Sequence, residues 1–263
     1  MSNKRPSGTL EWAKHNANCV KGCSHGCIYC YAKYNAVDRF KSIAPEKWAD
    51  EEINWKAVNK KWGKKSGTIM FPTTHDITPN TVDACLTCLK NILSAGNDVL
   101  IVSKPHFDVI MKLCKELEEY KDHILFRFTI GARDSDILKF WEPNAPDYSE
   151  RVTSLCWAFE KGYSTSVSME PVLDWDNVID LFLIMSEFVT DSIWIGTMNQ
   201  IDRRVKATTD EERAMVEKMK SWLTNENYRR VYEALKDHPK IEWKESMKDA
   251  LGLDSPSEAG LDV

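Results

Sequence analysis

The chain has 263 residues, of which 35 are basic and 40 acidic, and its formal net charge is -5. This length is enough to bury a substantial core without disulfides. The negative charge excludes a global positive field that attracts nucleic acid, although a local basic patch is still allowed.

Neither a signal peptide nor a membrane span is predicted. The first residues lack an apolar core, and no stretch approaches the ~20 apolar residues that a span requires. We therefore expect a cytoplasmic protein with no membrane partner. In that reducing compartment its eight cysteines are expected to be free thiols or metal ligands.

Residues 1–17 are predicted to form a short strand or arm that closes over the cysteine-rich segment 19–34. That segment contains Cys23, Cys27 and Cys30 in a C-x3-C-x2-C arrangement. Thiolates this close repel one another unless a cation neutralises them, and soft sulfur ligands favour zinc, copper(I) or an iron-sulfur cluster. One tight run is typical of a cubane cluster. Three ligands leave one iron open to an exogenous ligand.

A closed zinc site in a binding protein is the alternative from another functional class. Cys19 together with the triplet would supply four thiolates. The pair Cys27 and Cys30 would do the same with Cys85 and Cys88. Cys85, Cys88, Cys114 and Cys156 otherwise fall in helical patterns that predict core thiols.

Two segments after the cysteines are predicted to be wholly or partly helical. In residues 31–40, Tyr34, Val37 and Phe40 are spaced to turn inward. In residues 44–66, which are helical or partly irregular, tryptophans recur every seven positions and predict one buried stripe. These tryptophans are Trp48, Trp55 and Trp62.

From residue 67 onward, predicted strands alternate with predicted helices. The strands are 67–71, 99–102, 124–130, 163–169 and 192–195, and the helices are 80–95, 107–120, 134–141, 151–160 and 175–188. This order argues for a parallel sheet with right-handed crossovers, of about six strand-helix units. Residues 209–223 and 227–236 are predicted helices, and 254–260 a mobile tail.

Polar residues at the carboxyl ends of these strands are the site candidates, because functional groups in parallel barrels project from those ends. They are Thr74, His75, Asp76, Ser103, Lys104, Arg127, Thr129 and Glu170. Arg127 shares one strand face with Thr129 and needs an anionic partner, for which Asp76, Glu170 and a cofactor carboxylate are candidates. A helix N-cap at 73–76 and a surface role for Lys104 are the structural alternatives. Asn199 and Gln200 are weaker candidates.

The cysteine triplet with Tyr29 before its last cysteine resembles the signature of radical S-adenosylmethionine enzymes. Residues 18–32, together with Glu142-Pro-Asn-Ala-Pro146, Arg151 and Gly162, resemble the branch related to spore photoproduct lyase. The similarity spans roughly residues 8–200. It implies a partial (β/α)6 TIM-like barrel in residues 1–200, which leaves 201–263 as a helical C-terminal extension.

The resemblance also implies a cofactor pocket. A [4Fe-4S] cluster on Cys23, Cys27 and Cys30 would bind S-adenosyl-L-methionine and cleave it to a 5′-deoxyadenosyl radical that abstracts a substrate hydrogen. Tyr29 would pack near the adenine. Residues 73–76 stand where the family usually has a Gly-Gly-Glu-like motif, from which this chain departs. Ser103 and Lys104 would approach the methionine carboxylate.

The substrate does not follow from the resemblance. Glu170 stands where the branch more often has an uncharged residue, which suggests a substrate-specific group or a partner of Arg127. A small molecule, a nucleoside, a peptide or DNA is allowed, and DNA repair or nucleoside modification are alternatives within the same class. A flavodoxin or ferredoxin is the expected electron donor. Cys19 is a candidate hydrogen donor, and no catalytic residue is assigned.

Overall fold

The computed structural model describes residues 6–260, and seven strands of it form one parallel sheet. The order across the sheet is β1-β4-β5-β6-β7-β8-β9, and every neighbouring pair is parallel. The strands are β1 His15–Asn16, β4 Ile69–Phe71, β5 Val99–Ser103, β6 Ile124–Thr129, β7 Ser164–Met169, β8 Ile193–Ile195 and β9 Ile241–Trp243. Their mostly buried, apolar runs are typical of a parallel sheet that is covered on both faces.

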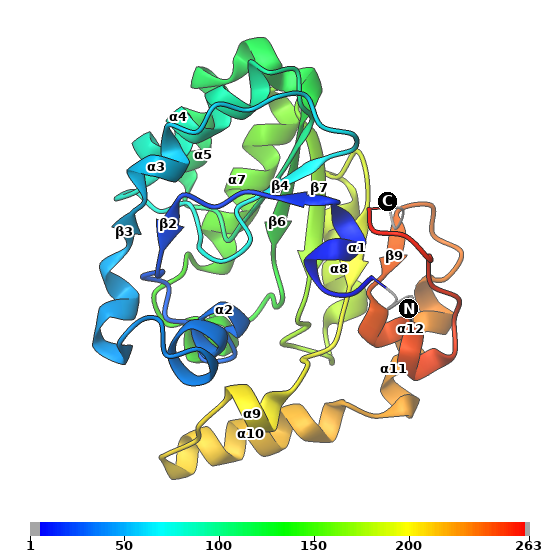
Figure 1. The fold of residues 1–263 in the computed structure, drawn as a ribbon. Helices are drawn as coiled ribbons and strands as arrows, with labels where there is room; N and C mark the ends of the chain where they lie inside the picture. Colours follow the sequence, from blue (N-terminus) through cyan, green and yellow to red (C-terminus); the bar gives the residue numbers. More distant parts are fainter. Residues whose placement is uncertain (1–5, 261–263) are drawn as a thin grey trace.

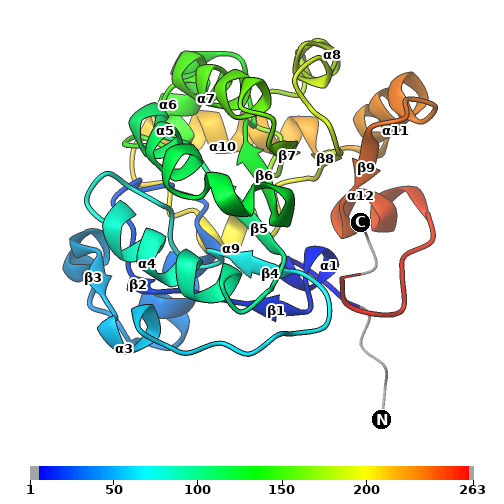
Figure 2. The same cartoon turned by 90° about the horizontal axis from the view of Figure 1, so that it is seen from above.

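Helices cover the outer side of the curved sheet (Figure 2). They are α4 Val82–Leu93, α5 Phe107–Glu116, α6 Ser135–Trp141, α7 Tyr148–Glu160, α8 Val178–Ser186 and α11 Asn225–Leu235. Within residues 6–260, the edge strands β1 and β9 do not pair with each other, so the barrel is partial. These elements confirm the predicted α/β class and the predicted strand-helix alternation.

The N-terminal arm fills the gap between the two edge strands. It forms the short helix α1 Thr9–Trp12 before β1, where a strand or arm was expected (Figure 2). The Glu11 carboxylate of α1 lies 2.7 Å from the ammonium of Lys244, the residue that directly follows β9. The segment 254–260, predicted as a mobile tail, lies against the arm, because the Gly260 N–H donates to the Leu10 carbonyl at 2.9 Å.

The C-terminal part contains more than the predicted helices. The helices α10 Asp210–Trp222 and α11 are confirmed, and α10 begins with a capping box between Thr209 and Glu212. The strand β9 and the helix α12 Glu245–Leu251 were not predicted. Three residues are too few to show a period of two. β9 extends the sheet by pairing with β8. The predicted division of the chain into two parts at residue 200 stays a prediction.

The helical or partly irregular character predicted for residues 31–66 is confirmed, but the inward position of Phe40 and the single tryptophan stripe are wrong. After α2 Tyr31–Lys33 the chain forms a π-helix, Tyr34–Arg39, and Phe40 is 64% exposed. Residues 44–66 contain the 3-10 helix Pro45–Asp50, β3 Glu52–Ile53 and α3 Trp55–Val58. Trp48 is buried but Trp55 is 60% exposed, so no single stripe exists. The left-handed φ of 54° at Glu51 ends the helical path between the two tryptophans.

No helix in the part of the chain from residue 6 to 260 has the length and apolar character of a membrane span.

Candidate functional site

A cavity of about 440 Å³ lies at the carboxyl ends of the parallel strands. The polar and titratable residues that line it come from the ends of six strands, from the cysteine loop and from the N-terminal arm. They include Thr9, Cys23, His25, Cys27, Tyr29, Cys30, Tyr31, Thr74, His75, Asp76, Ser103, Lys104, Thr129, Glu170, Asn199, Arg204 and Lys244. Of the predicted site residues, Arg127 and the weaker candidate Gln200 lie outside this lining, and the others meet in one place, as the strand-end rule requires.

The three cysteines of the triplet line this cavity together. Burial, reinforced by Asp76, raises the pKa of Cys23 to about 12. Burial also raises the pKa of Cys27 well above its ordinary value, and the nearby thiols add to this effect. Such thiols ionise at neutral pH only beside a strong cation, which is what a metal centre supplies.

The donor set fits a cluster better than it fits a single ion. Among residues 6–260, no three histidine, cysteine or acidic side chains converge closely enough to hold one metal ion. A cubane cluster binds each thiolate through a different iron, so its ligands need not meet at one point. Cys23, Cys27 and Cys30 satisfy that looser requirement by facing one cavity.

The carboxylate of Glu51 holds the start of the cysteine loop. It accepts hydrogen bonds from the Ser24 N–H at 3.0 Å and the Ser24 hydroxyl at 2.9 Å. Its other oxygen accepts from Thr78 at 3.0 Å and from Asn80 at 3.3 Å. Since the donors come from two separate loops, Glu51 fastens the cysteine loop to the segment that follows β4. Sequence reasoning missed this residue.

A second contact fixes the cysteine loop at Cys23, this time to the 3-10 helix Pro45–Asp50. The Cys23 N–H donates to the Trp48 carbonyl at 2.8 Å. At Gly22, a Cβ atom would lie 2.2 Å from that carbonyl oxygen, and the φ of 88° is left-handed. Only glycine allows this close approach.

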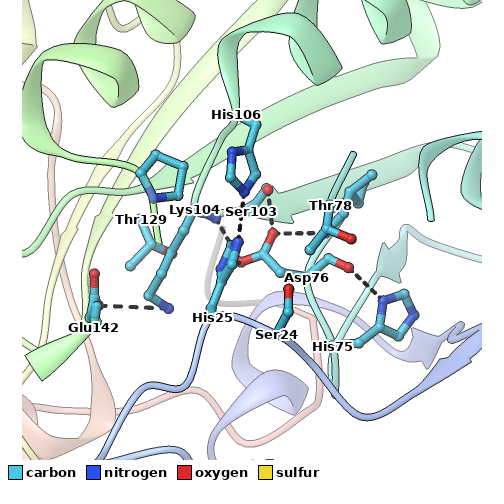
Figure 3. A network of polar contacts seen from close by, with 12 residues as sticks. Ser24, His25, His75, Asp76, Thr78, Ser103, Lys104, His106, Thr129 and Glu142 are labelled. Carbon is cyan, nitrogen blue, oxygen red and sulfur yellow. Dashed lines mark hydrogen bonds and ion pairs between the residues drawn. The ribbon is translucent and has the colours of Figure 1, made fainter. Parts of the chain in front are cut away.

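Asp76 is the most fully engaged carboxylate on the wall formed by β4 and β5 (Figure 3). It accepts hydrogen bonds from the Ser103 hydroxyl and from the Lys104 N–H, the latter at 3.0 Å. Its Oδ2 also lies 3.2 Å from His25 Nδ1. Burial opposes ionisation, but His25, Lys104 and Ser103 outweigh it and hold the pKa of Asp76 below its ordinary value. Asp76 is therefore a fixed negative charge.

The two histidines near Asp76 differ in their partners, which are backbone groups for His75 and side chains for His25. His75 accepts from the Cys19 N–H through Nε2 at 3.2 Å and therefore donates from Nδ1 to the Asp76 carbonyl at 2.8 Å. Both of its nitrogens are occupied by backbone groups. The His25 Nε2 atom lies 2.9 Å from Nε2 of His106, outside the cavity lining (Figure 3).

Glu142, from the second predicted motif, is buried behind the cavity wall. Its carboxylate lies 2.5 Å from Arg151 and 3.7 Å from Lys104, and it accepts the Tyr29 hydroxyl hydrogen. Burial opposes the charge, but Arg151 and Lys104 outweigh burial and lower the pKa of Glu142. The carboxylate thereby joins the cysteine loop, the end of β5 and α7.

Asn144 connects the same motif to the cysteine loop. Its N–H donates to the His25 carbonyl and its side-chain amide donates to the Ser24 carbonyl, both at 3.1 Å. The two motifs that were far apart in the sequence are therefore in direct contact.

Lys104 and Thr129 lie where they were expected. Burial disfavours the Lys104 ammonium, yet its pKa is raised well above its ordinary value because Cys27, Tyr29 and Glu142 surround it. Thr129 ends β6 and lines the cavity, and its carbonyl accepts from Arg151 at 3.1 Å.

Arg127 lies one layer below the cavity, with no exposed surface. Its guanidinium packs between the rings of Trp12 and Trp194, 4.7 and 5.1 Å from their centroids. Its acidic partner is Asp191 at 3.6 Å, instead of the three predicted candidates. Burial lowers the pKa of Arg127 to about 10.

Glu170, at the end of β7, faces the cavity with a partner that the sequence did not predict. The partner is Lys244, whose ammonium lies 3.4 Å from Glu170 and 2.7 Å from Glu11. Gly196 makes room for this pair, since a Cβ atom there would lie 2.9 Å from both side chains. Burial raises the pKa of Glu170 despite the opposing effect of Lys244.

The remaining cysteines lie outside the cavity lining. Cys19, Cys85, Cys88 and Cys114 are buried, and Cys156 is partly buried. The Sγ atoms of Cys19 and Cys85 are 3.7 Å apart, which places Cys19 in the core and away from the triplet. The prediction of core thiols is confirmed for Cys85, Cys88 and Cys114, and Cys19 joins them.

The sequence matches no protein-family model and no curated protein. Among solved structures, a spore photoproduct lyase variant with bound AdoMet and dinucleoside spore photoproduct is similar at 12% identity and a TM-score of 0.56. The match covers 92% of this chain and 79% of that chain. A second variant, with dinucleoside spore photoproduct, has 12% identity and a TM-score of 0.57 over the same shares.

SuiB from Streptococcus suis, bound to S-adenosylmethionine, has 12% identity and a TM-score of 0.46. That match covers 72% of this chain and 42% of SuiB. The likeness to spore photoproduct lyase shows a shared fold, and at that level it confirms the predicted resemblance.

Proposed function

We propose that the protein is a radical S-adenosylmethionine enzyme with one [4Fe-4S] cluster held by Cys23, Cys27 and Cys30. The observation that carries the proposal is that these thiols line one cavity together with the polar strand ends. The shared fold with spore photoproduct lyase supports it. When bound, the cluster supplies the electron that cleaves the cofactor to methionine and a 5′-deoxyadenosyl radical.

The residues near the ends of β4 and β5 are proposed to hold the methionine part of the cofactor. Asp76 has the fixed negative charge that an ammonium group requires, and the Lys104 ammonium suits a carboxylate. Ser103 and the Lys104 N–H keep Asp76 in place. His75, with both nitrogens engaged, shapes the loop on which Thr74 and Asp76 are carried.

The adenine end is proposed to lie toward Tyr29 and Thr129. Tyr29 is buried, and its hydroxyl donates to Glu142, so the position of its ring is fixed. Thr129 offers a hydroxyl on the neighbouring strand end. The buried pair of Glu142 and Arg151 closes this side of the cavity against solvent.

Glu170 belongs to the opposite wall and is proposed to face the substrate. Burial raises the pKa of its carboxyl group, and perturbed carboxyl groups that line a cavity are typical of functional sites. The substrate is proposed to be a small molecule, a nucleoside, a peptide or DNA, with a flavodoxin or ferredoxin as electron donor. DNA repair or nucleoside modification are narrower alternatives.

The test is anaerobic reconstitution with iron and sulfide, followed by metal analysis and by reaction with dithionite and S-adenosylmethionine. We expect a brown protein with about four irons per chain that releases 5′-deoxyadenosine. Cys27→Ala is expected to lose both properties. Cys114→Ala, which removes a buried thiol outside the cavity, is the matched control.

A colourless protein that holds one zinc and no iron would contradict the proposal and favour the structural zinc alternative. In this structure the free thiols of Cys19 and Cys85 contact each other in the core, with their Sγ atoms 3.7 Å apart. A four-thiolate zinc site would therefore require the cysteine loop to rearrange.

A further inference from the structure

The charged side chains that line the cavity differ in whether they have a partner of opposite charge. Lys104 has Glu142, and Glu170 and Lys244 have each other. Asp76 accepts hydrogen bonds from the Ser103 hydroxyl and the Lys104 N–H. Arg204 is the exception. Among residues 6–260 no carboxylate lies within ion-pair distance of its guanidinium, and its buried Nε has no hydrogen-bond partner.

Arg204 is carried by an anchored segment at the mouth of the cavity. It ends helix α9 Ile201–Arg204, which follows β8 and lies at the same end of the molecule as α2 (Figure 1). On one side of it, Asp202 pairs with Lys220 of α10 at 2.8 Å. On the other, Lys206 pairs with Asp38 of the π-helix. These two ion pairs anchor the chain on both sides of Arg204, which lines the cavity.

Among residues 6–260, the groups around Arg204 supply contact surface and a side-chain amide, and none of them forms an ion pair with it. Its Cζ lies 6.0 Å from the ring centroid of Tyr31, the residue after Cys30. The exposed amide of Asn199 lines the same cavity. Cys30 and Glu170 act on Arg204 only through longer-range electrostatics, and Glu170 is engaged with Lys244 at 3.4 Å.

The Arg204 guanidinium has a buried donor, Nε, that a bound anion would satisfy. Burial lowers the pKa of Arg204, but a guanidinium stays protonated at neutral pH and can only donate. An unpaired donor that is shielded from water costs free energy. A carboxylate or phosphate is the group that guanidinium geometry matches best.

We propose that Arg204 binds the anionic group of the substrate, a carboxylate or a phosphate, beside Cys30 and Tyr31. The inference rests on the proposed function, since it assigns this end of the cavity to the substrate. The strand order supports that assignment. Arg204 follows β8, the neighbour of β7, and β7 leads directly to Glu170, the group proposed to face the substrate.

The test compares Arg204→Gln with Arg203→Gln, which removes an exposed arginine one residue earlier in the same helix. Inorganic phosphate and acetate are titrated separately into reconstituted protein by calorimetry, at constant ionic strength set with chloride. We expect wild type and Arg203→Gln to bind one of the two anions alike, and Arg204→Gln to bind it at least tenfold more weakly. Which anion binds distinguishes a phosphate from a carboxylate substrate.

Arg204→Lys keeps the charge but loses the forked geometry, and we expect an intermediate affinity from it. Thermal unfolding of each variant checks that it is folded.

The proposal is overturned if Arg204→Gln binds both anions as wild type does, or if neither anion binds to wild type. It is also overturned if Arg204→Gln weakens S-adenosylmethionine binding as much as anion binding, which would place Arg204 in the cofactor site. Failure of the proposed function has a different signature. A protein that takes up no iron but binds the anion through Arg204 would retain this inference and contradict the cluster.

Discussion

The two walls of the cavity differ in how completely their polar groups are satisfied. On the cysteine side, Glu51, Asp76 and Glu142 each accept hydrogen bonds or ion pairs from several groups. On the β7 to β9 side, Glu170 has one partner at 3.4 Å and Arg204 has none within ion-pair distance among residues 6–260.

This difference indicates which wall has its polar groups fully paired in the absence of a ligand. Buried charges that are paired and hydrogen-bonded hold a site in place. A cluster and a cofactor whose position fixes the radical chemistry need such a wall. Polar groups that still lack partners are the ones that a variable substrate can complete. We therefore propose that the cysteine side is a cofactor wall and that the β7 to β9 side is a substrate wall.

The largest expected effect is on the cofactor wall. Glu142→Ala leaves the fully buried Arg151 without its carboxylate. Breaking a buried pair in this way costs about 3–5 kcal/mol, and we expect that loss in the free energy of unfolding measured with urea. The exposed Glu160→Ala, at the end of helix α7, is expected to change it by less than about 0.5 kcal/mol. Equal effects from the two variants would remove the distinction.

A pH titration of stability sharpens the same point. The folded pKa values of Asp76 and Glu142 lie below their ordinary values. Their stabilisation is therefore fully present above the unfolded values of about 4 and is lost as the pH falls through the folded values. We expect the stability gap between wild type and Glu142→Gln to be constant from pH 7 to 5 and to shrink below pH 4. A gap that widens in acid would contradict the assignment.

Glu51→Ala is expected to have an intermediate effect. It removes the acceptor of four hydrogen bonds, and the donors left behind cost about 1–3 kcal/mol. Because two of these bonds hold Ser24, we also expect faster loss of iron to a chelator after reconstitution. The exposed Glu52→Ala is the adjacent control. Iron loss at the wild-type rate would show that Glu51 does not position the cysteine loop.

The smallest effect is expected on the substrate wall. Glu170→Gln leaves Lys244 paired with Glu11, so we expect the free energy of unfolding to fall by less than about 1 kcal/mol. Urea denaturation beside Glu142→Gln measures this directly. A loss as large as that of Glu142→Gln would mean that both walls are equally built for stability.

The sheet could be predicted from the sequence because its strands are buried apolar runs that alternate with amphipathic helices. The strand-end rule then brought Asp76, Ser103 and Lys104 together correctly. It failed for Arg127, although Arg127 shares a strand face with Thr129. Inward side chains two residues apart occupy different layers of a barrel; Thr129 lines the cavity, whereas Arg127 packs between Trp12 and Trp194.

The missed residues depend on contacts that no local pattern contains. Lys244 follows a strand of three residues, too short for a periodic signal. Glu51 has a left-handed backbone and donors from separate loops. Arg204 is notable only because, among residues 6–260, the fold places no carboxylate within ion-pair distance of it. Each of these features arises from tertiary structure, so sequence reasoning had no signal for it.

The central claim is that the cysteine wall holds a cluster with one iron open to S-adenosylmethionine. Electron paramagnetic resonance of the reconstituted, dithionite-reduced protein, recorded with and without S-adenosylmethionine, tests it most directly. We predict a reduced [4Fe-4S] signal that shifts when the cofactor is added and that is absent in Cys27→Ala. No iron-sulfur signal, or a signal that the cofactor leaves unchanged, would contradict the account.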